Sequence, residues 1–171
     1  MKRFFATIAL FVALTASAFA GTLATYTSPK SDFTIQTPAT FVVENKTEQD
    51  SSGQPVSVST YVAVEENGNR LGILTKTYQY LISPELVKAA LLSAVKAQAK
   101  PDGGVRGGEY GDGYFVVFET ETGRAAILAV SKGSELFIVV FSAPQANVDA
   151  AGDEVKGIFS SFSTTVSSAS N

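Results

Sequence analysis

The stretch "ELFIVVFSAP", residues 135–144, decides the fold. Every position from Leu136 to Phe141 is apolar, without the alternation of a strand that has one face in water. Such a run is typical of a strand buried on both faces. We therefore expect Glu135–Ser142 to be a central strand of a covered sheet.

Two more strands precede this one. Tyr114–Thr120 and Arg124–Ser131 are rich in apolar residues, and short turn signals join them at Glu121–Gly123 and Lys132–Ser134. This spacing predicts a three-stranded antiparallel meander that ends in the central strand.

A long hairpin is predicted earlier in the chain. Valines alternate with polar residues through Val56–Val64, Asn67-Gly68 is a strong hairpin signal, and Arg70–Tyr80 resumes an extended pattern. Phe33 and Ile35 indicate a further strand before it. The polar residues 44–55 between them are expected to form a loop.

Two segments have helical periodicity. Ser83, Pro84 and Glu85 form a helix start, with Ser83 as a possible cap, and Pro101 ends the helix. A second helix is expected from about Val148 to Phe162. The apolar stripe of the first helix consists of Leu86, Val87, Ala90, Leu91, Ala94 and Val95.

The N-terminal residues have the pattern of a cleaved secretory leader. A basic start, an apolar run from Phe4 to Leu14 and the sequence Ala18-Phe19-Ala20 all fit, so we expect residues 1–20 to be removed before Gly21. Residues 21–163 are then expected to be one α+β domain and residues 164–171 a flexible polar tail. This pattern predicts a secreted or periplasmic protein with no membrane insertion after cleavage.

The charge and the missing residue types narrow the function. The formal net charge is −3, and loss of Lys2 and Arg3 with the leader lowers it to −5, which disfavours nucleic acid as a partner. The chain has no Cys, His or Trp. Thiol nucleophiles, imidazole bases and zinc sites built from them are therefore excluded. Carboxylate-only catalysis, Ser-Lys chemistry and hard-cation binding stay open.

The order of these elements resembles the Mog1/PsbP-like fold. The resemblance covers most of Asp32–Ser163 and rests on "FTIQTP" (33–38), "SPELVKAALLSAVKA" (83–97), "ELFIVVFSAP" (135–144) and "VKGIFSSFS" (155–163). It implies an α+β fold in which about six antiparallel strands are flanked by two main helices, an α/β/α sandwich. Members include photosystem accessory subunits, a nuclear-transport cofactor and secreted bacterial proteins, mostly binding or assembly modules. The resemblance assigns no functional role to any residue.

The glycine-rich stretch "PDGGVRGGEYGDGYF", residues 101–115, is the most unusual feature. Its spacing matches neither the dinucleotide fingerprint nor the P-loop. It approaches a calcium-binding repeat, but Tyr110 stands where the third glycine belongs, and there is one copy. The other interpretation is a helix-to-strand connection with a turn at Gly111–Gly113. Because it is longer than such a connection needs, we expect a mobile binding edge formed by Arg106, Glu109, Tyr110, Asp112 and Tyr114.

Two further sets of residues are candidates for a site. Glu65 with Glu66, and Glu119 with Glu121 on one face of a strand, could hold a cation or act as acid and base, or could be solvated turn charges. Four tyrosines could line a groove at one edge, or could be half-buried strand residues: Tyr78, Tyr80, Tyr110 and Tyr114.

Together these features favour a non-enzymatic binding or assembly module without a cofactor, acting on an unidentified protein partner in the cell envelope. A carboxylate-dependent extracellular hydrolase and a carrier of small molecules or calcium are the alternatives.

Overall fold

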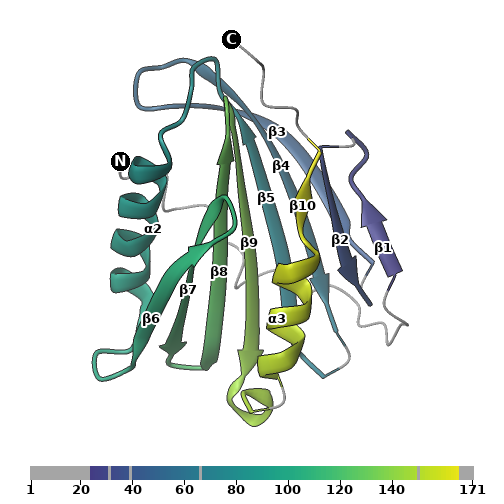
Figure 1. The fold of residues 1–171 in the computed structure, drawn as a ribbon, viewed down its shortest axis with the longest axis vertical. Helices are drawn as coiled ribbons and strands as arrows, with labels where there is room; N and C mark the ends of the chain where they lie inside the picture. Colours follow the sequence, from purple (N-terminus) through teal and green to yellow (C-terminus); the bar gives the residue numbers. More distant parts are fainter. Residues whose placement is uncertain (1–23, 31, 39, 66, 150, 166–171) are drawn as a thin grey trace.

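The computed structural model describes residues 24–165, except residues 31, 39, 66 and 150 (Figure 1). The leader expected at residues 1–20, its cleavage point before Gly21 and the tail residues 166–171 lie outside the described residues. Within the described residues, the fold consists of a seven-stranded sheet, a three-stranded sheet and two α-helices.

The large sheet is antiparallel throughout. Its strands lie in the order β3 (Val42–Gln49), β4 (Pro55–Val64), β5 (Arg70–Thr77), β9 (Glu135–Pro144), β8 (Gly123–Lys132), β7 (Gly113–Thr120) and β6 (Val105–Tyr110). β9 lies at the centre, which confirms the prediction from its apolar run. The meander β7–β8–β9 and the hairpin β4–β5 are also confirmed, and Gly68 has the left-handed φ of 87° that the hairpin turn requires.

Two layers cover the sheet on opposite sides (Figure 1). We call these sides the α2 face and the α3 face. On the α2 face, helix α2 (Pro84–Gln98) packs on β7 and β8. On the α3 face, helix α3 (Ala151–Ser161) packs on β9 and on the small sheet formed by β1 (Ala24–Thr27), β2 (Phe33–Thr37) and β10 (Ser163–Thr164). A short 3₁₀ helix, η1 (Gln145–Asn147), leads from β9 toward α3.

Side chains of the central strands alternate between the two faces. Leu136 and Ile138 of β9 belong to the core under α2, whereas Phe137, Val139 and Phe141 belong to the core under α3. This two-residue alternation places apolar side chains on both sides of β9. The uninterrupted apolar sequence of β9 is therefore explained by a separate hydrophobic core on each face.

The α+β class and the antiparallel sheet with two main helices are confirmed, but the large sheet contains two segments that we did not predict as strands. Residues 44–49, expected in a polar loop, belong to β3, an edge strand whose polar side chains are almost all exposed. Residues 105–110, expected in a flexible connection, form β6 at the opposite edge. Polar and charged side chains are common on edge strands, where they discourage pairing with another chain.

Two end predictions also need correction. Ser83 is the residue before α2, but its side chain makes no capping bond to the helix, and its hydroxyl donates to the Glu85 carboxylate instead. Thr164, placed in the polar tail by the sequence analysis, pairs with Phe33 as part of β10, and the Thr165 amide donates to the Asp32 carbonyl. Ordered pairing therefore extends two residues into the segment that we expected to be a tail.

Candidate functional site

The five residues of the expected binding edge do not form one surface. The register of β6 and β7 places Arg106 opposite Val117 on the α3 face, and Glu109 opposite Tyr114 on the α2 face. Tyr110 lies on the α3 face near Phe115, with ring centroids 6.3 Å apart. Because neighbouring side chains of a strand point to opposite faces, consecutive residues of β6 serve different faces.

Three of these five residues attach the β6–β7 hairpin to the rest of the domain. The Lys88 ammonium of α2 lies 4.5 Å from the centre of the Tyr114 ring and 4.0 Å from the Glu109 carboxylate. The Lys132 ammonium at the end of β8 donates to the Asp112 carboxylate. Asp112 of the calcium-like sequence therefore has an ion-pair partner within the domain.

A cavity of about 680 Å³ is a groove on the α2 face, which we call the α2 groove. It lies between the first turns of α2, the connection at residues 78–83 and the β3–β4 turn. Leu81 and Leu86 line it and are 77% and 70% exposed, and Tyr80 is 45% exposed. Leu86 was expected in the buried stripe of α2, but Val87 occupies the inward position.

An ordered carboxylate lies at the rim of the α2 groove. One oxygen of Asp50 accepts from the Ser52 amide at 2.8 Å, the Ser52 hydroxyl at 2.7 Å and the Gln54 amide at 2.9 Å, and its other oxygen accepts from the Tyr80 hydroxyl at 3.0 Å. These hydrogen bonds, with that of the Ser52 hydroxyl the largest cause, lower the pKa of Asp50 to about 2. Asp50 is therefore a fixed negative charge at neutral pH.

The same rim contains a partly buried ion pair. The Lys76 ammonium, 6% exposed in its side chain, lies 3.2 Å from the Glu48 carboxylate, and Lys46 lies 2.8 Å from the other oxygen of Glu48. Burial raises the pKa of Glu48, but the hydrogen bonds and charges of Lys46 and Lys76 outweigh it, so the pKa is lowered. Burial also raises the pKa of Tyr78, whose ring lies 5.3 Å from that of Tyr80.

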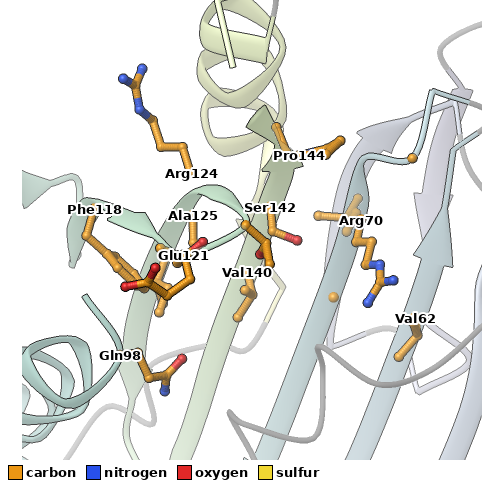
Figure 2. Close-up of a pocket in the computed structure, with 17 residues that line it drawn as sticks. Val62, Arg70, Gln98, Phe118, Glu121, Arg124, Ala125, Val140, Ser142 and Pro144 are labelled. Carbon is orange, nitrogen blue, oxygen red and sulfur yellow. The ribbon is translucent and has the colours of Figure 1, made fainter. Parts of the chain in front are cut away.

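A second cavity, about 480 Å³, lies at the other end of α2 (Figure 2). Gln98 from α2, Glu121 from the β7–β8 turn and Val140 from β9 lie on the same side of the strands, whereas Arg124 extends away from them. Glu119, expected on the same face as Glu121, instead lies 3.7 Å from Arg124. Because β7 ends at Thr120, the two-residue alternation on which the Glu119–Glu121 pair was predicted does not extend to Glu121.

A third cavity, about 310 Å³, lies between α3 and the ends of β7, β8 and β9, and we call it the α3 cavity. Its walls are apolar except at Arg124 and Lys156, and Tyr110 lies beside them. The four tyrosines predicted at one edge are therefore divided. Tyr78 and Tyr80 line the α2 groove, Tyr110 lines the α3 cavity, and Tyr114 packs against the core under α2.

One acidic pair in the structure was not identified by the sequence analysis. Glu65 of the β4–β5 turn is 7% exposed and hydrogen-bonds to Glu154 of α3, whose carboxylate also accepts from the Asn69 amide at 2.8 Å. Burial, followed by the hydrogen bond and charge of Glu65, raises the pKa of Glu154 to about 7. The expected partner of Glu65, Glu66, is not among the described residues.

The chemistry of this acidic pair is that of two carboxyls sharing a proton. Glycosidase carboxyls are separated by about 5–9.5 Å, which leaves room for a sugar or a water. Glu65 and Glu154 are in direct hydrogen-bond contact, and neither lines the three cavities above. In the described part of the chain, no group of three or more Asp, Glu, His or Cys side chains is arranged to hold a metal ion. Neither described helix has the length and apolar character needed to cross a bilayer.

Comparison with known proteins finds a likeness in structure alone. No family model matches the chain, and no curated protein matches its sequence. The structure is similar to the solution structure of cyanobacterial PsbP (CyanoP) from Synechocystis sp. PCC 6803, with a TM-score of 0.50 and 11% identity. The match covers 89% of this chain and 97% of that chain. This confirms the PsbP-like fold that the sequence patterns suggested.

Proposed function

We propose that this PsbP-like domain is a non-enzymatic binding module of the cell envelope that docks a protein partner in the α2 groove. The observation that carries the proposal is the exposure of Leu81 and Leu86 beside Tyr80. Grouped apolar side chains in water mark interaction surfaces more often than scattered ones do. Their burial by a partner would be favourable at about 25 cal/mol per Å² of apolar surface.

The charge at the rim indicates what the partner presents. Asp50 is ionised at neutral pH and most of the groove wall is apolar, so the matching segment carries apolar side chains and a basic one. The Tyr80 ring adds a rigid anchor that donates its hydroxyl to Asp50. Tyrosines of this kind are enriched among the residues that dominate binding energy in protein interfaces.

Two features support a binding role over catalysis. The chain contains no Cys or His, so a thiol nucleophile and an imidazole base near neutral pH are absent. The acidic pair Glu65–Glu154 has too short a separation for either glycosidase geometry and lies away from the α2 groove.

Site-specific crosslinking tests the docking proposal. A photo-crosslinking amino acid at position 86 should capture one defined polypeptide in cells of the native host. The same group at position 97, exposed on the same helix but outside the groove, should not capture it. L86D should reduce capture of that polypeptide at least tenfold from a crosslinker at position 81. Equal capture from positions 86 and 97 would contradict the proposal.

The location of the protein is tested separately. N-terminal sequencing of the protein recovered from the envelope fraction should give Gly21 as the first residue. Recovery of the protein from the cytoplasm with Met1 intact would contradict export, whatever the result of the crosslinking.

A further inference from the structure

We propose that the α3 cavity is a binding site for a small amphiphilic carboxylate, a molecule with an apolar chain of about ten carbons and an anionic end. This site lies on the opposite face of the sheet from the α2 groove, so the proposal does not depend on the docking proposal.

The cavity exists because small residues line it where larger ones would fill it. Ala126 and Ala143 form its floor on β8 and β9, and Ala151 and Gly152 of α3 form its roof. A Cβ atom added at Gly152 would meet no atom within 4 Å. The larger side chains Phe115 and Val117 on β7 are only half-buried beside it. α3 packs on β2 and β9, so it does not extend over β7.

The lining has the chemistry of an apolar pocket with a cationic mouth. Apart from the hydroxyl of Tyr110, the charged groups of Arg124 and Lys156 are its only polar side chains, and none of the described residues that line it is acidic. Small-molecule sites commonly combine apolar walls with a few polar groups that orient the ligand. Because no acidic side chain lines the cavity itself, the two cations favour an anionic end group.

Both cations are available to a ligand. Arg124 lies opposite Ala143 in the β8–β9 register, so it is on the α3 face, and it extends away from Gln98 and Glu121 (Figure 2). Its contact with Glu119 is 3.7 Å, and that of Lys156 with Asp153 is 3.4 Å. All four side chains are substantially exposed, and exposed pairs of this kind contribute little stability. A carboxylate in the cavity mouth can replace these partners and bind the Arg124 guanidinium through two oxygens.

The volume sets the size of the apolar part. A volume of about 310 Å³ is at the lower end of the range for small-molecule sites. At about 30 Å³ per heavy atom, the share of a liquid water, it holds on the order of ten atoms. Decanoate is therefore a suitable probe. Decanol has the same chain without the charge, and decyltrimethylammonium has the opposite charge.

The first test is calorimetric titration of the purified protein with the three probes. We expect decanoate to bind with one site per chain, decanol at least tenfold more weakly, and decyltrimethylammonium not at all. The double substitution R124Q/K156Q should weaken decanoate binding at least tenfold and change decanol binding less than threefold. Failure of decanoate to bind at millimolar concentration, or equal binding of the cationic probe, overturns the proposal.

The second test blocks the cavity with a matched control on the same helix. Gly152 and Gly157 are both exposed on α3, and a Cβ at either would meet nothing within 4 Å, but Gly152 alone lines the cavity. G152L should abolish decanoate binding, whereas G157L should retain it within twofold. Melting curves of both variants check that they fold. Retention of binding in a folded G152L variant overturns the proposal.

A third measurement separates a free carboxylate from a membrane headgroup. Sedimentation with phosphatidylglycerol vesicles should leave the wild-type protein in solution while decanoate still binds. Vesicle binding that is equal in the wild type and in G152L would place anion recognition on the surface and overturn the assignment to the cavity.

Discussion

The two helices cover opposite faces of one sheet, yet they leave different kinds of space. α2 buries Val87, Leu91, Ala94 and Val95 against β7 and β8, and its groove lies outside the helix, where Leu86 is exposed. α3 buries Ala151, Ile158 and Phe159, and its cavity lies beneath the helix. The difference lies in what leaves each recess open: Leu86 stays uncovered beside the α2 groove, whereas the small side chains of Ala126, Ala143 and Ala151 leave the α3 cavity unfilled.

The two ends of the molecule also differ in the state of their carboxyls. Asp50 beside α2 is held ionised by hydrogen bonds from neutral donors. Burial and the neighbouring Glu65 raise the pKa of Glu154 on α3 to about 7, so this carboxyl is partly protonated at neutral pH. The region near α2 therefore presents a permanent charge, whereas the attachment of α3 to the β4–β5 turn depends on a proton.

The largest expected effect distinguishes the side of α2 that packs on the sheet from the side that lines the α2 groove. Leu91→Ala should lower the free energy of unfolding by about 2–5 kcal/mol, because it leaves a cavity in place of a side chain that is 3% exposed. Leu86→Ala should change it by no more than about 0.5 kcal/mol. Urea unfolding measures both. Similar losses for the two variants would mean that Leu86 is buried and that the α2 groove is closed in solution.

The next effect concerns the β6–β7 hairpin, which contributes residues to both faces. Gly113→Ala should cost about 1–3 kcal/mol, because a Cβ there would lie 2.5 Å from the Ala129 carbonyl oxygen of β8. Gly104→Ala is the matched control, since its Cβ would meet nothing within 4 Å. The control should be neutral or slightly stabilising. Equal thermal stability of the two variants would contradict the close pairing of β7 with β8.

A smaller effect tests the protonation of Glu154 on α3. Because the pKa of Glu154 is raised to about 7, its contribution to stability is complete below pH 4.5 and is lost as the pH rises through 7. The wild type should lose on the order of 1 kcal/mol between pH 5 and pH 8, after screening by water. Glu154→Gln should remove this loss.

Asp50→Asn should retain the loss, since the stabilisation from Asp50 is lost only as the pH falls toward 2. Chemical unfolding at several pH values measures the loss, and an unchanged slope in E154Q would exclude Glu154 as its source.

The smallest effect tests the ionised rim near α2. Tyr80→Phe removes one of the hydrogen bonds to Asp50, so the pKa of Asp50 should rise part of the way from about 2 toward 3.8. The melting temperature should hardly change, because Tyr80 is 45% exposed and Asp50 keeps its hydrogen bonds from Ser52 and Gln54. Carboxyl titration by NMR measures the shift. A pKa that does not move would show that Ser52 and Gln54 alone hold the charge.

Part of the candidate surface could be read from the sequence, and part could not. Tyr80 and Tyr110 were identified as possible ligand-contacting tyrosines, and each does line a cavity. Leu86 was assigned to the core because it adjoins the apolar stripe of α2, although one position along a helix rotates a side chain by about 100° away from Val87. Arg124 and Lys156 were not predicted together, because they come from different elements and meet only when α3 packs beside β8.

The glycine-rich stretch shows the same division within one segment. Gly107 and Gly108 have no side chains, so the sequence carries no alternating pattern for β6. The pairing of β6 with β7 explains these glycines, because a Cβ at Gly107 would lie 2.8 Å from the Phe115 carbonyl oxygen of β7. These glycines therefore permit close approach between two strands.

The sequence by itself determined the elements whose signals are local. Examples are β9, which is apolar on both faces, the Asn67-Gly68 turn and the amphipathic helix α2. Hydrophobic periodicity and turn chemistry depend on a few neighbouring residues. Only the tertiary structure decided which distant groups meet, as Glu65 meets Glu154, and where packing leaves the α2 groove and the α3 cavity open. The physical reason is that the raised pKa of Glu154 and the recesses arise from groups on different elements, whose distances are set by how the two faces pack.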